Sequence, residues 1–444
     1  LKFVFKNMKK YCKHDENRVC VNNGNCGGCV YHGKGKRKPN KDVNYVKPQT
    51  SISVKGNGVK NNDPYIDFKA LYKIVMRLGV KTKIKRFFNT GKNNAVLIIK
   101  RDGIGDFVLF KDAFKRLREF YKDKKLVVLV TNYTKPLAES YGYFDEVIAL
   151  SKSDFTTENI YKTYKRLSKY KFDVLLHPTQ PRNIEAEVSA YLVNAKVKIA
   201  SRGENGAHTP KTKAKFDTIY DTLIETGNEN MTLIQTANFL RGIGVSDYKI
   251  SLPRLTSTVE FKMFLPKNYF VIFMGGSIYN KLWPAERFYQ VAKHIQSKTG
   301  YDVVLCGTKE DVGELEIFKS QGDLNFYSYI NKTSLLELVD ILSKAKLVVS
   351  NDTSAVHIAN ALGVKSVAIK GQFSGSKFYP YVAEVVNKGD IYPNYVEIER
   401  HCSWCTLKGK PYHCIGGNYF ADKKLKCVLD IPLEKVIEKI DEIL

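Results

Sequence analysis

The sequence predicts an α/β protein with two doubly wound, Rossmann-like domains that face each other across a cleft. Short apolar strands alternate with helical patterns between residues 95 and 177, and the alternation returns between residues 269 and 369. Such alternation produces parallel sheets covered by helices. With 444 residues and 43% hydrophobic content, the chain is long enough for two cores. A basic, cysteine-containing extension is expected at residues 1–93.

The first domain is expected over residues 94–255. The strand AVLIIK (95–100) runs into the turn RDGIGD (101–106), and a helix is predicted over 107–122. Residues 201–230 are expected to be irregular, and LPRL (252–255) to be an interdomain linker. Further strands are predicted at 126–130, 146–150 and 173–177.

The second domain is expected over residues 256–430, and a last helix over 431–444. Its central feature is KLVVSNDTSAVHIANALGVKSVAIKG (346–371), which predicts a strand, a turn, a helix and a second strand. Free N–H groups and the helix dipole make such a turn an anion site. The alternative is that Asp352, Thr353 or Ser354 only caps the helix. Other elements are predicted at 269–277, 285–298, 302–307, 313–320 and 334–345.

The net charge of +26 is concentrated near the N-terminus, where residues 1–93 hold 22 Lys and Arg against 5 Asp and Glu. Charge of this kind indicates phosphate-rich partners, either anionic lipid or nucleic acid. A general lysine-rich composition is the alternative. Residues 67–88 predict a basic amphipathic helix that either lies on a membrane surface or packs against the next domain. Its apolar stripe is Phe68, Leu71, Val75 and Leu78.

No run of 18 apolar residues occurs, so no membrane-spanning segment is expected. Residues 1–11 are basic and no apolar stretch follows, so no signal peptide is expected and disulfides are disfavoured. Cys306 ends an apolar strand and is predicted to be core. The other eight cysteines form two groups, each with a Cys-x-x-Cys pair that favours zinc or an iron–sulfur cluster, unless they are simply unligated. These are Cys12, Cys20, Cys26, Cys29, Cys402, Cys405, Cys414 and Cys427.

Several enzyme classes lack their motifs in this chain. The dinucleotide fingerprint is missing, because GIGDFV has Val108 where the third glycine belongs. Neither a Walker A sequence nor a GxSxG elbow occurs. Dehydrogenases, P-loop NTPases and α/β-hydrolases are therefore disfavoured.

Three blocks, in order, resemble glycosyltransferase family 9, the heptosyltransferase-like family. They are IIKRDGIGDFVLF, MGGSIYNKLWPAERFYQVA and VVSNDTSAVHIANALGVKSVAIKG, and they span about residues 95–372. The resemblance implies the GT-B fold, with the acceptor mainly on the first domain and a nucleotide-sugar donor mainly on the second. It implies inverting transfer of a sugar, often heptose from an ADP-activated donor, onto a lipopolysaccharide-core or other lipid-linked acceptor. No cofactor is expected for the transfer.

The resemblance and the chemistry together assign the site residues. Asp106 is the predicted general base for the acceptor hydroxyl, with a helix N-cap as the alternative. Lys281 is the predicted cation for the leaving diphosphate, unless it is only a solvated loop lysine. Further donor-binding residues are Gly276, Ser277, Glu310, Asp352, Thr353, Ser354 and His357.

Three of these assignments are qualified by the sequence. Glu310 matches the family's ribose-binding acid only by its distance from the three blocks. The family usually has glycine where this chain has Ser354. His357 is expected either to orient or contact phosphate or to be structural.

Two other functions stay open at this point. One is another GT-B enzyme such as a nucleotide-sugar epimerase, and the other is a metal-bearing, basic nucleic-acid-binding protein. The N-terminal charge lacks an aromatic-interleaved recognition motif, which favours the enzyme, and no specific nucleic acid is expected. The enzyme is expected in the cytoplasm, peripheral to the inner face of the cytoplasmic membrane.

Overall fold

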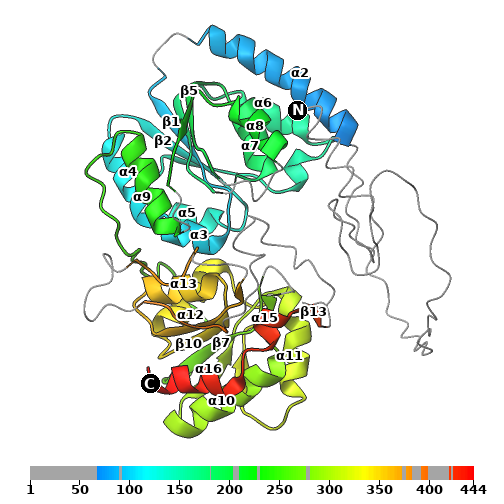
Figure 1. Cartoon of the computed structure of the whole chain (residues 1–444), viewed down its shortest axis with the longest axis vertical. Coiled ribbons are helices and arrows are strands. Elements are labelled where there is room, and N and C mark those ends of the chain that lie inside the picture. The colour runs from blue at the N-terminus through cyan, green and yellow to red at the C-terminus, as the bar shows by residue number, and fades with distance from the viewer. Residues whose placement is uncertain are drawn as a thin grey trace, which may run out of the picture.

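The chain folds into two α/β halves, each built on a six-stranded parallel sheet (Figure 1). The computed structural model describes residues 68–89, 93–180, 182–203, 210–227, 231–276, 281–372, 377–382, 392–398, 420–421 and 424–444. No helix in these ranges is long and apolar enough to cross a membrane.

The first sheet has the order β3-β2-β1-β4-β5-β6, and every pair of neighbours is parallel. Its strands are β1 (Ala95–Ile99), β2 (Lys125–Val130), β3 (Glu146–Ala149), β4 (Phe172–His177), β5 (Ala195–Ser201) and β6 (Thr222–Ile224). Its helices are α2 (Phe68–Phe87), α3 (Ile104–Leu109), α4 (Lys111–Phe120), α5 (Lys135–Ser140), η1 (Ser153–Phe155), α6 (Ile160–Leu167), α7 (Ile184–Leu192), α8 (Pro210–Asp217) and α9 (Thr232–Gly242).

The second sheet has the order β12-β11-β10-β7-β8-β9 and is also parallel throughout. Its strands are β7 (Tyr269–Phe273), β8 (Asp302–Leu305), β9 (Phe326–Ser328), β10 (Val348–Asn351), β11 (Ser366–Ile369) and β12 (Asn394–Val396). Its helices are α10 (Ala285–Thr299), η3 (Lys309–Asp311), α11 (Val312–Lys319), α12 (Leu335–Lys344), α13 (Ser354–Ala361), α15 (Lys426–Leu429) and α16 (Leu433–Asp441). A small hairpin joins β13 (Phe420–Ala421) and β14 (Lys424–Leu425).

Both sheets have the strand order of a Rossmann fold, so each has one point where the chain changes direction across the sheet. In the first sheet that point lies between β1 and β4, and in the second between β7 and β10. Ligands of open α/β sheets bind outside the carboxyl ends of the strands at such points. The turns that follow β1, β7 and β10 are therefore where a site is expected.

The two halves pack against each other through these same regions. Helix α3 of the first half lies against α13 of the second, and α5 lies near α12 (Figure 1). One apolar cluster contains Phe107 and Val108 of the first half together with Ala355 and Ile358 of the second. The expected linker takes part as well, because the N–H of Leu255 donates to the carbonyl of Ala361 at 2.7 Å.

Helix α2 packs over α6 and α7 of the first half (Figure 1). Val75 and Leu78 are buried in that half's core, and the hydroxyl of Thr82 donates to the carbonyl of Leu192 at 3.1 Å. A Cβ on Gly79 would come within 1.9 Å of the Tyr191 ring, so the helices approach closely there. The described part of the predicted stripe therefore packs against the domain instead of facing a membrane. The side chains of Phe68 and Leu71 lie outside the described residues.

Some elements differ from the sequence prediction. The helix predicted over 107–122 is two helices, α3 and α4, which meet at the buried residue Phe110. The stretch 201–230, predicted to be irregular, contains α8 and β6. Strand β5 was not predicted, because Lys196 and Lys198 interrupt its apolar pattern while its neighbours β4 and β6 hold it in the sheet.

Candidate active site

The turn after β1 carries four charged residues at the switch point of the first sheet. Lys100 pairs with Asp102, and its ammonium lies 4.8 Å from the centre of the Phe110 ring. The hydroxyl of Thr179 reaches the same Asp102 carboxylate at 3.5 Å. Arg101 is buried and donates to the carbonyl of Leu150 at 2.6 Å. Charge pairing within the protein therefore stabilises this turn without a ligand.

Asp106 lies in the first turn of α3, but it is not the helix cap. The N-cap is Gly103, which provides no side-chain hydrogen bond. The N-cap interpretation of Asp106 is therefore wrong. Its carboxylate instead faces the second half, where Oδ1 lies 3.3 Å from Nζ of Lys377.

Opposing effects act on the acidity of Asp106. Burial raises its pKa, but the cations Lys377 and Lys100, helped by His357, outweigh burial and hold the pKa below its ordinary value. The neighbouring Asp102 has a raised pKa because it is buried and lies beside Asp106, although Lys100 opposes this effect. Asp106 is therefore the more acidic of the two carboxylates.

The loop after β7 brings Gly276 and Lys281 to the second sheet's switch point. A Cβ on Gly276 would lie 3.1 Å from Leu282 and 3.3 Å from Thr353, so this loop lies close to the β10–α13 turn. The N–H of Trp283 donates to Oδ1 of Asn351 at 2.9 Å and ties the two segments together. These contacts bring the predicted donor loop and the predicted anion turn into one place.

Lys281 is a half-buried cation with a perturbed pKa. Burial lowers its pKa to about 8, with Asp352 and Asp106 opposing the shift and Lys377 adding to it. The residue therefore lies near carboxylates from both halves of the molecule. A solvated surface lysine does not fit this environment.

The β10–α13 turn is both a helix cap and a candidate anion site. Thr353 is the N-cap, and its side chain accepts from the N–H of Ala355 at 3.4 Å. The N–H of Asp352 donates to the carbonyl of Ile369 at 3.0 Å. The N–H groups of Asp352 and Ala355 are thus engaged, which leaves those of Thr353 and Ser354 as the candidates for an anion.

His357 lies in the contact between the halves. Its Nδ1 is 3.0 Å from the hydroxyl of Tyr381, and its ring stacks on Tyr379 at 5.5 Å. A Cβ on Gly105 would come within 2.8 Å of its ring, so the two turns touch here. Burial lowers the pKa of His357, with Asp352 and Asp106 opposing, so the ring is neutral at pH 7.

The sequence prediction missed several residues of this junction. Lys377, which pairs with Asp106, follows no motif, and its only signal is the adjacent aromatic run FYPY. Asp311 is buried, and its carboxylate occupies the space that a Cβ on Gly275 would take. Glu310, which was predicted to bind ribose, is 65% exposed on the same short helix η3.

Some predicted residues cannot be placed. Ser277 lies outside the described residues, as do seven of the eight cysteines predicted to bind metal, all except Cys427. Cys427 is buried in the apolar cluster of the second half, and Cys306 is core as predicted. No group of three or more potential metal ligands comes together within the described ranges.

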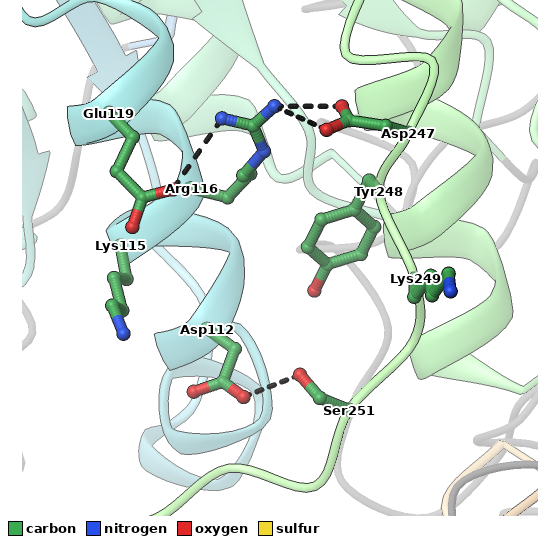
Figure 2. Close-up of a pocket in the computed structure, with 8 residues that line it drawn as sticks. All are labelled: Asp112, Lys115, Arg116, Glu119, Asp247, Tyr248, Lys249 and Ser251. Atoms are coloured by element: carbon green, nitrogen blue, oxygen red, sulfur yellow. Dashed lines mark hydrogen bonds and ion pairs between the residues drawn. The ribbon is translucent and has the colours of Figure 1, made fainter.

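A cavity of about 260 Å³ lies away from this junction, between α4 and the segment after α9 (Figure 2). Arg116 forms two hydrogen bonds with Asp247, at 2.7 and 2.9 Å, and Asp112 accepts from the hydroxyl of Ser251. Its polar groups bond to one another and hold α4 against this segment. We assign it a structural role.

Asp106 on one Rossmann-like half lies near Lys281 and the N-terminus of α13 on the other, an arrangement that fits the two-domain GT-B class. The model of glycosyltransferase family 9 (heptosyltransferase) matches residues 160–407, more than half of the chain. The chain belongs to this family.

Relatives with assigned names agree with this membership. A lipooligosaccharide heptosyltransferase 2 from Campylobacter jejuni subsp. jejuni is 26% identical over 169 residues, which are 37% of this chain and 47% of the relative. The chain thus spans about half the length of that relative. A putative glycosyltransferase from Haemophilus influenzae is 22% identical over 348 residues, covering 71% of this chain and 90% of the relative.

Solved structures share the fold. A family 9 glycosyltransferase from Veillonella parvula has 18% identity and a TM-score of 0.55, covering 80% of this chain and 99% of that one. The E. coli ADP-heptose lps heptosyltransferase II has 15% identity and a TM-score of 0.56, covering 79% and 98%. The E. coli heptosyltransferase WaaC, solved with ADP-2-deoxy-2-fluoro heptose, has 16% identity and a TM-score of 0.54, covering 78% and 99%. The predicted GT-B architecture is confirmed.

Proposed function

We propose that this protein is an inverting glycosyltransferase that moves a sugar, with heptose favoured, from an ADP-activated donor to a lipopolysaccharide-core or other lipid-linked acceptor. The observation that carries the proposal is the position of Asp106 opposite Lys281 and the β10–α13 turn. Family membership supports the reaction class. The similar WaaC structure, solved with an ADP-heptose analogue, supports the choice of ADP.

In the proposed reaction Asp106 is the general base. Its carboxylate takes the proton of the acceptor hydroxyl while that oxygen forms a bond to the anomeric carbon of the donor. The bond from the anomeric carbon to the phosphate oxygen breaks, and its electron pair leaves with the nucleoside diphosphate. Because Asp106 is ionised at neutral pH, it can accept this proton.

The second half stabilises the leaving group. Negative charge grows on the phosphate oxygens as the bond breaks, and fixed cations and N–H groups act on that charge. Lys281 provides the cation, and the amides of Thr353 and Ser354 provide donors at the N-terminus of α13. His357, being neutral, orients this turn against α3 and adds no charge. Gly276 leaves room for the backbone to approach the phosphates, and Glu310 and Ser277 remain proposed donor contacts.

A transfer assay tests the proposal directly. ADP-heptose and a truncated lipopolysaccharide-core acceptor are incubated with the enzyme, and the product is read by mass spectrometry. ADP should bind in calorimetry and raise the melting temperature, while a random oligonucleotide should do neither. Conversion of the donor without an acceptor would favour an epimerase instead. No transfer with ADP, UDP or GDP sugars would contradict the proposal.

We also propose peripheral contact with the anionic inner face of the cytoplasmic membrane, where a lipid-linked acceptor would be found. Val75 and Leu78 are buried in the core, so they do not make this membrane contact. The proposed contact is made by the outer face of α2, where Val80 and Ile84 are 51% and 55% exposed. Helix α2 has seven basic and no acidic residues. Basic residues near an anionic surface each add about 1 kcal/mol of attraction.

The two cysteine groups remain a proposed zinc or iron–sulfur site, separate from the transfer step. Purified protein should carry metal, and Cys402→Ser combined with Cys405→Ser should lower its content. Protein that lacks metal and yet keeps its melting temperature would show that the cysteines are incidental. The proposed domain boundaries, near residues 93, 255 and 430, are tested by limited proteolysis.

A further inference from the structure

One ion pair joins the predicted base to the opposite half of the molecule. Nζ of Lys377 lies 3.3 Å from Oδ1 of Asp106, and their side chains are 27% and 17% exposed. The backbone of Lys377 is held in place, because its carbonyl accepts from the N–H of Thr232 at 3.0 Å at the start of α9. The ammonium also lies 4.7 Å from the centre of the Phe378 ring. The backbone of Lys377 is thus anchored to the first half, and its ammonium lies between the Asp106 carboxylate and the Phe378 ring.

Three lysines of the junction lie beside carboxylates. Within the described residues, Lys100 pairs with Asp102, Lys377 pairs with Asp106, and Lys281 lies near Asp352. His357 is neutral and adds no charge at pH 7. These three lysines therefore lie beside carboxylates before a donor binds.

A nucleoside diphosphate brings at least two negative charges to these lysines. Charges a few ångströms apart interact strongly in a partly buried site, so the diphosphate competes with the carboxylates for the lysines. Lys377 lies close enough to Lys281 to lower that residue's pKa, so the two ammonium groups border the same space. Lys377 is the more exposed partner of its pair, and it is therefore the cation that the diphosphate can draw away.

We propose that Lys377 is a counter-ion that leaves the base when the donor binds. It pairs with Asp106 before the donor binds and turns to the diphosphate afterwards. This movement frees Asp106 for the acceptor hydroxyl. This inference rests on the proposed function and adds a positioning residue and an order of events to it. The base is held as a weak proton acceptor until the donor arrives, so the acceptor is activated only when there is a sugar to transfer.

The electrostatics of Asp106 agree with this sequence of events. Burial raises its pKa, while Lys377, Lys100 and His357 lower it, and Lys281 lies close enough to feel its charge. Loss of Lys377 and arrival of a diphosphate both raise the pKa of Asp106. ADP binding at acidic pH should therefore make Asp106 take up a proton.

Calorimetry of ADP binding near pH 5, in two buffers with different ionisation enthalpies, measures this proton uptake. The wild-type enzyme should take up more protons than Asp106→Asn, and this difference measures the proton uptake of Asp106. In Lys377→Met this difference should fall at least twofold, and Lys377→Arg should restore it. Lys319→Met, on α11 away from the junction, is the matched control and should behave as wild type.

The outcomes separate the inference from the function beneath it. Equal proton uptake by the wild type and Asp106→Asn, or by the wild type and Lys377→Met, would overturn the inference while ADP binding and transfer still stood. Failure of ADP to bind at any pH would overturn both. Lys377→Met should also weaken ADP binding about tenfold through loss of a charge-assisted contact, and unchanged affinity would show that Lys377 never reaches the diphosphate.

Discussion

The two halves of the molecule place differently charged turns on the same scaffold. In both, a short helix follows a central strand at the switch point of the sheet. The turn after β1 carries Lys100, Arg101, Asp102 and Asp106, and its N-cap is a glycine. The turn after β10 has a threonine N-cap, and among its small polar residues Asp352 alone is charged. Strand order therefore fixes where the two turns meet, while their side chains suit them to the different roles proposed above, proton transfer for the first and anion binding for the second.

The strongest test of this division is the removal of the base. Asp106→Asn should lower kcat about 10²- to 10⁴-fold, because a general base acts in the transition state. ADP affinity should stay within about threefold, because donor binding belongs to the other half. Steady-state kinetics and calorimetry measure the two effects. The matched control is Asp112→Asn on the next helix, in the cavity of Figure 2. If Asp106→Asn kept more than a tenth of wild-type activity, Asp106 would not be the general base.

Helix α2 of the first half has no counterpart among the described residues of the second, and its two faces should respond differently to substitution. Leu78→Asp puts a charge into the core and should destabilise the protein by about 3–5 kcal/mol. Ile84→Asp on the outer face should change stability by about 0.5 kcal/mol or less. Denaturant unfolding measures both. A chain that begins at Asn93 should lose stability for the same reason, and unchanged stability would show that α2 is an independent appendage.

Raising the pH should weaken donor binding by the second half without changing the ionisation of Asp106 in the first. The pKa of Lys281 is lowered to about 8, so the residue is charged below pH 8 and neutral above it. ADP affinity should fall about tenfold between pH 7 and pH 9, as one charge-assisted contact is lost. Lys281→Arg should flatten this dependence, because a guanidinium stays charged. A pH dependence that is the same in both proteins would assign the effect to another group.

The contact between the two turns can be tested by steric change. Gly105→Ala places a Cβ within 2.8 Å of the His357 ring, so one turn must shift. Activity should fall about threefold to thirtyfold, as expected for a small displacement of a reacting group. In a His357→Ala background the same substitution should have a smaller effect. Additive effects would show that the turns do not act through this contact.

The smallest expected effect concerns the membrane. Ile84→Asp should reduce binding of the full chain to vesicles that contain anionic lipid, while turnover of a soluble acceptor analogue stays unchanged. Phe264→Asp on the second half is the matched control for loss of an exposed apolar side chain. Salt near 0.5 M should weaken wild-type binding, because exposed charges are screened over a few ångströms. Equal binding by both variants would contradict a role for the outer face of α2.

Much of the fold could be read from local sequence. Apolar strands such as AVLII and VVSN are buried on both faces, so their continuous patterns identify them, and the turns that follow supply Asp106, Lys281 and the Asp352–His357 set. Strands β5 and β6 escaped prediction because polar residues interrupt the pattern and pairing with neighbours stabilises them. Their existence depends on contacts that a local window does not contain.

The sequence by itself determined the two sheets, the position of the turns and the residue types available for chemistry. The tertiary structure decided the partners: Gly103 caps α3 in place of Asp106, Thr353 caps α13, and Lys377 faces the base. It also decided which face of α2 is core, since Val75 and Leu78 meet α6 and α7 while Ile84 stays outside. Backbone preferences act over a few residues, whereas an ion pair between distant segments depends on how the two halves pack.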